Sequence, residues 1–288
     1  MNSPCFKRIA TVLILLISLN AATASNLRAQ AGGQARPTPA FSKPEQIKED
    51  INAVPCKGNT ERLKAVKALF EKMGAPASDI SIEKTVNTEN IVVRKSGSSP
   101  GLIVIGAHYD KVSAGCGAVD NWTGIVAIAH IYKTIKDLPL KKSVLFVGFG
   151  REEEGLVGSN DMVRAIEKGR LNDYCAMINI DSLGLGIPQA DTGISDKKLV
   201  ARAVELAKRM GMPFQQTFIF EGDSDSSSFR QRKIPAISFH GLSNEWKKVL
   251  HTNEDKLAKV NPMSVYMGYR LALALYGEVE NAACEAFR

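Results

Sequence analysis

Acidic residues and histidines follow each of four short apolar runs in the sequence. The runs are LIVIGA (102–107), SVLFVGF (143–149), AMINI (176–180) and AISFH (236–240). The residues that come after them, in chain order, are His108, Asp110, Asp120, Glu152, Glu153, Glu154, Asp181 and His251. Imidazole nitrogens and carboxylate oxygens are the ligands of catalytic zinc, which keeps one coordination position free for water or substrate.

Two histidines and three of these acids would suffice for two metal ions if one carboxylate bridged them. Two metals about 3.5–4 Å apart polarise a carbonyl and generate a hydroxide nucleophile between them. A further acid would then act as general base, and adjacent glutamates suit this, since side chains of consecutive residues diverge. The alternative for Glu152–Glu154 is acidic charge that complements the start of a helix, and this interpretation is kept for Glu154.

The four apolar runs alternate with helical patterns, and this alternation predicts the fold. The helical stretches are 122–136, 156–168, 196–210 and 262–275. Two amphipathic helices (47–55 and 60–74) and a hairpin-like β pair (79–85 and 89–97) precede them. Continuous apolar strands separated by helices predict an α/β protein, a three-layer αβα sandwich with a central mixed, mostly parallel sheet. Ligands bind at the carboxyl ends of such strands, so the acids and histidines are expected at one edge of the sheet.

The N-terminal region predicts export. A basic pair, KR, precedes the apolar run IATVLILLISLNAA, which ends in the small-residue sequence ATA at residues 22–24. This is typical of a secretory signal peptide over 1–24, and the run is shorter than the roughly 20 residues of a membrane span. Residues 25–42 are rich in Gly, Pro and Ala and predict a flexible linker, which leaves 43–288 as one domain. The expected location is therefore periplasmic or secreted, with no membrane association after cleavage.

Charge and cysteine content argue against other classes of protein. Cleavage would remove two positive charges and no acid, so that the formal net charge falls from +7 to +5, and no block of Lys or Arg indicates nucleic acid as a partner. Four cysteines would remain, with three possible disulfide connectivities. Pairing of Cys116 with Cys175 is disfavoured, because one follows a strand's carboxyl end and the other precedes a strand's amino end. None forms a CxxC pair, which argues against a thiolate zinc site.

Five motifs resemble, in the same order, those of the M28 family of zinc aminopeptidases over most of residues 43–288. They are GAHYD, AVDNWTG, REEEGLVGS, NIDSLG and LHTNED. The resemblance implies two zinc ions. His108, Asp120 and Glu153 would hold one of them, and Asp181 and His251 would complete the other, with Asp120 shared.

Further roles follow from the same resemblance. Glu152 would be the general base, and Asp110 would orient the ligand His108. The family has a cis peptide bond after the bridging aspartate, which here would join Asp120 and Asn121. Apart from the resemblance, the position of Asp255 four residues after His251 predicts that it holds the loop or caps the next turn.

The function implied is an exported metallopeptidase that removes N-terminal residues from peptides. A metal-bridging water would attack the scissile carbonyl after Glu152 takes its proton, and Glu152 would return that proton to the leaving amine. The nearest alternative is a single-zinc glutaminyl cyclase of the same fold, although Leu250 precedes His251 where the cyclases typically carry tryptophan. A non-catalytic binding module would be expected to lack ligands or the base. Phe220, Phe229 and Trp246 are candidates for the specificity pocket, and no pattern indicates an oligomeric state.

Overall fold

The computed structural model describes residues 37–220 and 222–288. The predicted signal peptide and most of the predicted linker lie outside these residues. The last part of that linker packs against the domain, because the Ala40 N–H donates a hydrogen bond to the Thr134 carbonyl and Ser42 is buried. The packed domain therefore begins before the predicted boundary at residue 43. Across the described part of the chain, no helix combines the length and the apolar character of a membrane span.

Helices and strands alternate along most of the domain. The helices are α1 (Pro44–Asn52), α2 (Asn59–Lys72), α3 (Thr123–Ile135), α4 (Val157–Ala165), α5 (Lys197–Arg209), α6 (Ser226–Gln231) and α7 (Pro262–Asn281). The strands are β1 (Ile80–Lys84), β2 (Glu89–Lys95), β3 (Leu102–His108), β4 (Ser143–Phe149), β5 (Tyr174–Ile180), β6 (Gln189–Asp191), β7 (Gln215–Thr217) and β8 (Ala236–His240). Each stretch that was predicted as helix or strand coincides with one of these elements, apart from small shifts at the ends.

The strands form one sheet of eight in the order β1-β2-β4-β3-β5-β8-β6-β7. The four central strands β4, β3, β5 and β8 run parallel to one another. The predicted β pair is the antiparallel hairpin β1–β2, and the pairs β2–β4 and β6–β8 are also antiparallel. The prediction of a mixed, mostly parallel sheet is thus confirmed. The short strands β6 and β7 were not predicted, because three residues are too few to produce a periodic pattern.

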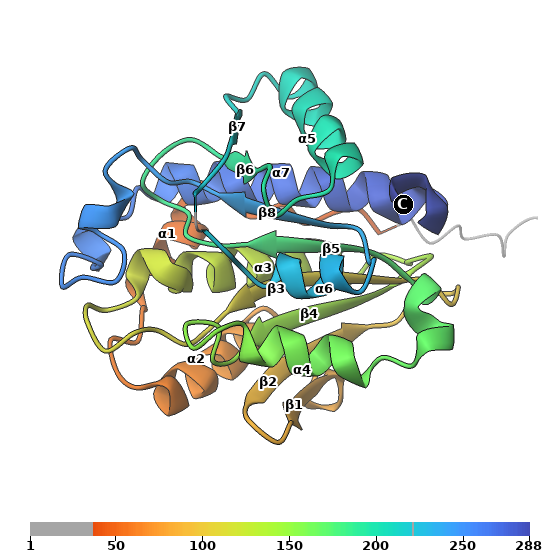
Figure 1. Cartoon of the computed structure of the whole chain (residues 1–288), viewed down its shortest axis with the longest axis horizontal. Helices are drawn as coiled ribbons and strands as arrows, with labels where there is room; N and C mark the ends of the chain where they lie inside the picture. The colour runs from red at the N-terminus through yellow and green to blue at the C-terminus, as the bar shows by residue number, and fades with distance from the viewer. Residues whose placement is uncertain (1–36, 221) are drawn as a thin grey trace, which may run out of the picture. The chain divides into compact units, whose positions relative to one another are not determined.

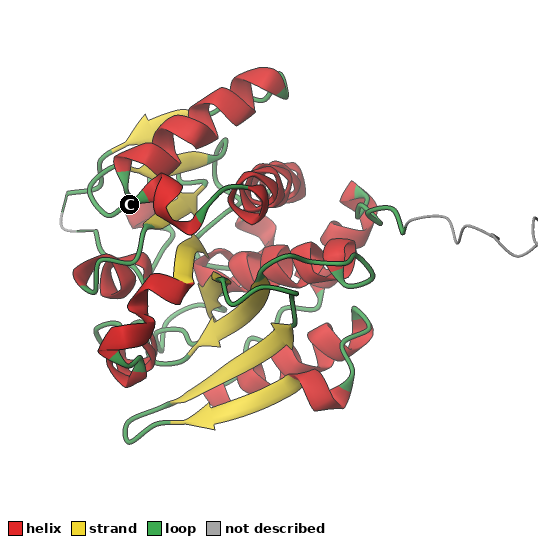
Figure 2. Cartoon of the chain, turned by 90° about the vertical axis from the view of Figure 1, so that its right-hand side faces the viewer, coloured by secondary structure: helices red, strands yellow, loops and turns green. Residues whose placement is uncertain are grey.

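Helices cover both faces of this sheet (Figures 1 and 2). Side chains alternate along β3: Ile103 and Ile105 belong to the larger core, which includes residues of α1, α2, α3, α5 and α7. Val104 points to the other face, where Val163 of α4 and Phe229 of α6 close a second core. Because both faces of the central strands are buried, their sequences are continuous apolar runs rather than alternating ones.

Candidate metal centre

The carboxyl ends of the central strands bring the candidate residues to one edge of the sheet. His108, the last residue of β3, pairs in register with Phe149, the last residue of β4. The N–H of Asp181 donates to the carbonyl of Phe239 in β8, which places the end of β5 beside the end of β8. Residues that follow these strands are therefore neighbours, although they lie far apart in the sequence.

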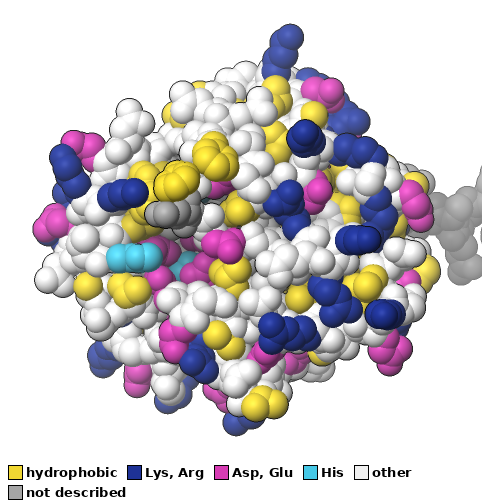
Figure 3. Space-filling view, in the orientation of Figure 1, with side chains coloured by type: hydrophobic (Ala, Val, Ile, Leu, Met, Phe, Trp, Pro, Cys, Tyr) yellow, Lys and Arg dark blue, Asp and Glu magenta, His cyan; other side chains and the backbone are white. Residues whose placement is uncertain are grey.

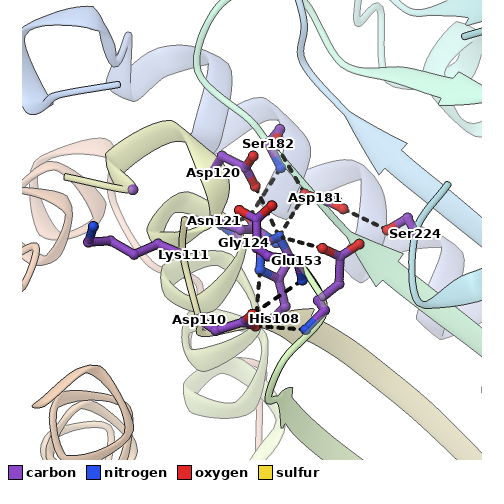
Figure 4. A network of polar contacts seen from close by, with 12 residues as sticks. His108, Asp110, Lys111, Asp120, Asn121, Gly124, Glu153, Asp181, Ser182 and Ser224 are labelled. Carbon is purple, nitrogen blue, oxygen red and sulfur yellow. Dashed lines mark hydrogen bonds and ion pairs between the residues drawn. The ribbon is translucent and has the colours of Figure 1, made fainter. Parts of the chain in front are cut away.

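Both histidines contact the same carboxylate. His108 Nε2 lies 3.0 Å from Asp120 Oδ1, and His251 Nε2 lies 3.2 Å from Asp120 Oδ2. His108 Nε2 is also 3.4 Å from Asp181 Oδ1, whereas His251 Nε2 is 3.0 Å from Glu153 Oε2. The five candidate ligands thus converge, and Figure 4 shows the part of this network around His108. The closest contacts group His108 with Asp181 and His251 with Glu153, which differs from the grouping that the resemblance implied.

The donor set fits a divalent cation of the zinc type. Two sets of three residues have ligand atoms that all lie within 4.8 Å of one another: His108 with Glu152 and Asp181, and His108 with Asp120 and Glu153. Among the described residues, no hydrogen-bond partner is present for the buried Oε1 of Glu153. An unpaired carboxylate oxygen inside a protein is costly, and a bound metal ion would satisfy it. Nitrogen and oxygen donors without thiolates suit a catalytic rather than a Cys-based structural zinc site.

The pKa values of these groups are shifted because several ionisable side chains are buried close together. Burial opposes ionisation of Asp120, but hydrogen bonds from His108 and His251 hold its pKa below the ordinary value. Burial raises the pKa of Glu152 well above its ordinary value; the charge of His108 lowers it, and that of Asp181 raises it again. Hydrogen bonds to Asp120 and Glu153 raise the pKa of His251 to about 10. In the metal-free chain, protons therefore occupy positions that a cation would take.

Asp110 supports two parts of the site at once. One of its carboxylate oxygens lies 3.6 Å from His108 Nδ1. The same carboxylate accepts hydrogen bonds from the backbone N–H groups of Glu152 and Glu153, at 3.0 and 3.2 Å. It therefore faces the histidine ring without a direct hydrogen bond, and it fixes the turn that carries both glutamates, so that their side chains start from a defined position.

Hydrogen bonds to two other segments of the chain hold the loop that carries Asp120. The Asp255 carboxylate accepts hydrogen bonds from the N–H groups of Val119 (2.7 Å) and Asp120 (3.1 Å). The peptide bond between Asp120 and Asn121 is cis, and the Asn121 side chain donates to the carbonyl of Ile180 at the end of β5. These contacts tie the loop of Asp120 to the segment that follows His251 and to the end of β5. Asp255 thus holds the loop of Asp120, whereas the prediction placed its role in the segment that follows His251.

Sequence reasoning missed two residues that support Asp181. The hydroxyl of Ser224 donates to Asp181 Oδ2 at 2.6 Å, and the Asn179 side chain donates to Ser224 Oγ, also at 2.6 Å. Asn179 is a polar residue within the apolar run AMINI, and this was a usable signal, since a buried amide needs partners. Ser224 carried no such signal, because serines are common in loops.

Arg62 was also missed, and it supports the loop that leads from His108 to Asp120. Its guanidinium is fully buried and donates to the carbonyls of Tyr109, Cys116 and Gly117. The group lies 5.9 Å from the ring centre of Trp122. Burial lowers the pKa of Arg62 to about 10, and the surrounding carboxylates oppose this effect. Its charged residue type favours exposure, although its place four residues before Val66 puts it on the buried face of the helix.

Replacing Arg62 by methionine is therefore expected to destabilise the domain. Several buried carbonyls would lose a charged donor, and each such hydrogen bond contributes about 1.5–3 kcal/mol, so a loss of about 3 kcal/mol or more is expected in the free energy of unfolding. Urea unfolding measures it. Lys64→Met on the same helix is the matched control, because Lys64 is exposed, and it should stay within about 0.5 kcal/mol of the parent. An Arg62→Met variant as stable as that control would contradict the role.

Two disulfides fix the surroundings of the site. Cys56 bonds to Cys116, next to the metal-binding loop, and Cys175 at the start of β5 bonds to Cys284 near the end of the chain. This is one of the three possible connectivities, and it excludes the pairing of Cys116 with Cys175 that was disfavoured. The first bridge anchors the loop to the segment before α2.

A cavity of about 200 Å³ opens beside the candidate ligands. Figure 3 shows this hollow, with a histidine and acidic side chains next to apolar ones. Its lining outside the ligand set includes Asp191, Ile194, Ile219, Asp223, Ser224, Ser238, His240, Leu242, Trp246 and Leu250. Trp246 lies in the wall, as predicted. The other two aromatic candidates were wrong: Phe229 is fully buried against Phe149 in the core, and Phe220 is 72% exposed and outside this lining.

Comparison with known proteins agrees with this geometry. Leucine aminopeptidase 2 of Trichophyton rubrum is 29% identical over 178 residues, which cover 57% of this chain and 36% of that protein. The chain therefore matches little more than a third of this relative's length. Among solved structures, a zinc aminopeptidase from Bacillus subtilis has a TM-score of 0.61 and 24% identity, over 70% of this chain and 54% of that one. An Acidobacteriales bacterium glutaminyl cyclase has a TM-score of 0.71 and 18% identity, over 85% of this chain and 97% of that one.

These solved structures show that the fold is shared, and they do not by themselves distinguish aminopeptidase from cyclase. The family model described as Peptidase family M28 matches residues 90–275. This range contains every candidate ligand as well as Glu152 and Asp110. The chain belongs to peptidase family M28.

Proposed function

We propose that this protein is a zinc aminopeptidase that holds two metal ions. The observation that carries the proposal is the position of Asp120, whose two carboxylate oxygens contact two different histidines. A carboxylate in this position can give one oxygen to each of two ions. The relatives named above support the metal and the reaction class, because one is a leucine aminopeptidase and another a zinc aminopeptidase.

The contacts suggest which residues would hold each ion. His108, Asp120 and Asp181 would bind one ion, on the basis of their short mutual distances. His251, Asp120 and Glu153 would bind the other. When bound, zinc would polarise the scissile carbonyl and lower the pKa of water.

Glu152 is the proposed general base. Its carboxylate is the most remote from the imidazoles, with Oε2 at 3.9 Å from His108 Nε2, and it lines the cavity. It would take a proton from the attacking water and pass it to the leaving amine. The hydrogen bond from the Glu152 N–H to Asp110 keeps its backbone in place during this transfer. Acidic groups around the cavity would attract the free α-amine of the substrate, which favours removal of N-terminal residues.

We further propose that the protein is exported. The basic pair followed by an apolar run and a small-residue cleavage sequence supports this location. The two disulfides, Cys56–Cys116 and Cys175–Cys284, are consistent with an oxidising compartment. Cell fractionation of the full chain, with and without residues 1–24, tests the proposal.

The activity is tested with leucine 4-nitroanilide, before and after removal of metal by a chelator. Release of nitroaniline that disappears with the chelator and returns with zinc is expected. The competing function is cyclisation of an N-terminal glutamine, since the fold is also that of a glutaminyl cyclase. A glutamine-initiated peptide assayed in parallel separates the two, because cyclisation without nitroaniline release would overturn the proposal.

Zinc binding is expected to strengthen as pH rises. Hydrogen bonds to Asp120 and Glu153 raise the pKa of His251 to about 10, so this ring carries a proton at neutral pH in the metal-free chain. A ligand imidazole must lose that proton, and zinc uptake therefore releases it. The apparent association constant should rise about tenfold per pH unit for each proton released, between pH 6 and pH 8. Competition with a coloured chelator measures it, and an affinity independent of pH would contradict the ligand role of His251.

A further inference from the structure

Among the described residues that line the cavity, two carboxylates belong neither to the proposed ligands nor to the proposed base Glu152. Asp191, the last residue of β6, is only 1% exposed and lines the cavity. Its Oδ1 accepts a hydrogen bond from the Gly193 N–H at 2.8 Å, whereas its buried Oδ2 has no hydrogen-bond partner among the residues that the structure describes. Asp223 is exposed and also lines the cavity, and its Oδ1 accepts the N–H of Ser224. The pocket thus has one buried and one exposed carboxylate.

Among the described residues of the cavity wall, none neutralises the negative charges of Asp191 and Asp223. No Lys or Arg occurs among the lining residues within 37–220 and 222–288. The one buried histidine of the wall outside the ligand set, His240, accepts the Leu242 N–H at Nδ1 and lies 2.8 Å from Thr217 Oγ1 at Nε2, an arrangement of the neutral ring. Burial lowers the pKa of His240 to about 4, which agrees with this tautomer.

The proposed metal ions would not supply the missing charge. Two divalent ions would carry four positive charges, and the carboxylates of Asp120, Glu152, Glu153 and Asp181 line the site that would hold them. Arg62 adds one positive charge nearby and Asp110 and Asp255 add two negative ones, so the ions would leave no surplus positive charge for Asp191 and Asp223. A buried, unpaired carboxylate is unfavourable unless a cation or a hydrogen-bond donor reaches it.

The rest of the wall is apolar and defines the shape of a suitable ligand. Ile194, Ile219 and Leu242 line the cavity together with Trp246 and Leu250. An aliphatic stem can pack against these side chains, while a terminal cation reaches the carboxylates, as long basic side chains do on mixed surfaces. A leucine side chain would fill the apolar part but would leave Asp191 unpaired.

We infer that the pocket selects peptides whose N-terminal residue is lysine or arginine, with Asp191 and Asp223 as the residues that determine this specificity. The inference rests on the proposed aminopeptidase function and deepens it. The side-chain cation would pair with Asp191 Oδ2 inside the pocket, and Asp223 at the exposed side would attract the cation during entry.

The test compares kcat/KM for the 4-nitroanilides of lysine and norleucine, which share a four-carbon stem and differ in the terminal ammonium. Because a charge-assisted hydrogen bond in a desolvated pocket is strong, lysine should exceed norleucine by about tenfold or more. Asp191→Asn keeps the acceptor for Gly193 and removes the charge, so the lysine-to-norleucine ratio should fall towards one. Asp137→Asn is the matched control, because Asp137 is exposed beyond the last turn of α3, and it should keep the parental ratio.

Failure of the inference is distinguishable from failure of the proposed function. If norleucine is released as fast as lysine, with sensitivity to chelator, the specificity is wrong and the aminopeptidase stands. If neither is released, the proposed function itself is wrong. An unchanged ratio in Asp191→Asn would overturn the role of this residue. Should that variant not fold, Asp223→Asn and increasing salt must each lower the ratio, and a ratio insensitive to both overturns the inference.

Discussion

Glu152→Gln is expected to lower kcat by a factor of about 10²–10⁴ while zinc content stays at the parental level. Glutamine has the shape of glutamate but cannot accept and return a proton. The variant keeps its backbone hydrogen bond to Asp110, so the turn should not move. Glu152 also lies outside the closest histidine–carboxylate contacts, at 3.9 Å from His108, which is why metal retention is expected. Steady-state rates with leucine 4-nitroanilide and elemental analysis of the same samples measure both quantities.

The neighbouring glutamate provides the control. Glu154 is exposed and pairs with Arg151 at 2.7 Å, away from the cavity. Glu154→Gln makes the same chemical change two residues along the chain and should leave kcat unchanged. A Glu152→Gln enzyme as fast as Glu154→Gln would contradict the base assignment. Loss of zinc together with kcat would instead assign Glu152 to the ligands, as its proximity to His108 and Asp181 would allow.

The elements that can be predicted from the sequence are those in which burial on both faces produces a continuous apolar run. Strands β3, β4 and β5 are covered on both faces, and their residues are therefore apolar throughout, apart from Asn179 and the strand ends. Polar residues at the ends, such as His108 and Asp181, are then conspicuous. Because parallel strands share one direction, the edge of the sheet at which these residues meet also follows from the pattern.

Other features depend on contacts between distant segments and leave no local pattern. Arg62 shares the buried face of α2 with Val66 and Leu69, but a charged residue type favours exposure, and only the loop around Gly117 that folds over it provides its partners. Ser42 belongs to a stretch without periodicity, but its hydroxyl lies 2.7 Å from the ring of the buried His130. Motif order predicted which residues are candidate ligands, whereas the contacts among them became known only from the distances. His251 was grouped with Asp181 from sequence, while its short contacts are to Asp120 and Glu153.

Asp120→Ala is expected to lose both metal ions and all chelator-sensitive activity together. Residues that only support a ligand typically contribute about 10–100-fold to metal affinity, and a ligand shared by two ions should contribute more. The backbone position of residue 120 does not depend on its side chain, because Asp255 holds the N–H groups of residues 119 and 120. Circular dichroism should therefore show a folded variant, and elemental analysis should show it free of zinc.

Comparison with a ligand of one ion makes this test specific for bridging. Among the described carboxylates His251 contacts Asp120 and Glu153 alone, so His251→Ala should lose one ion and keep the other at the site of His108 and Asp181. In a single-zinc protein the parent would bind one ion, and at least one of the variants His251→Ala and His108→Ala would retain it in full. Stoichiometric zinc in Asp120→Ala would exclude a bridging carboxylate. A parental stoichiometry of two that falls to one in His251→Ala and to none in Asp120→Ala is the result that only a shared ligand explains.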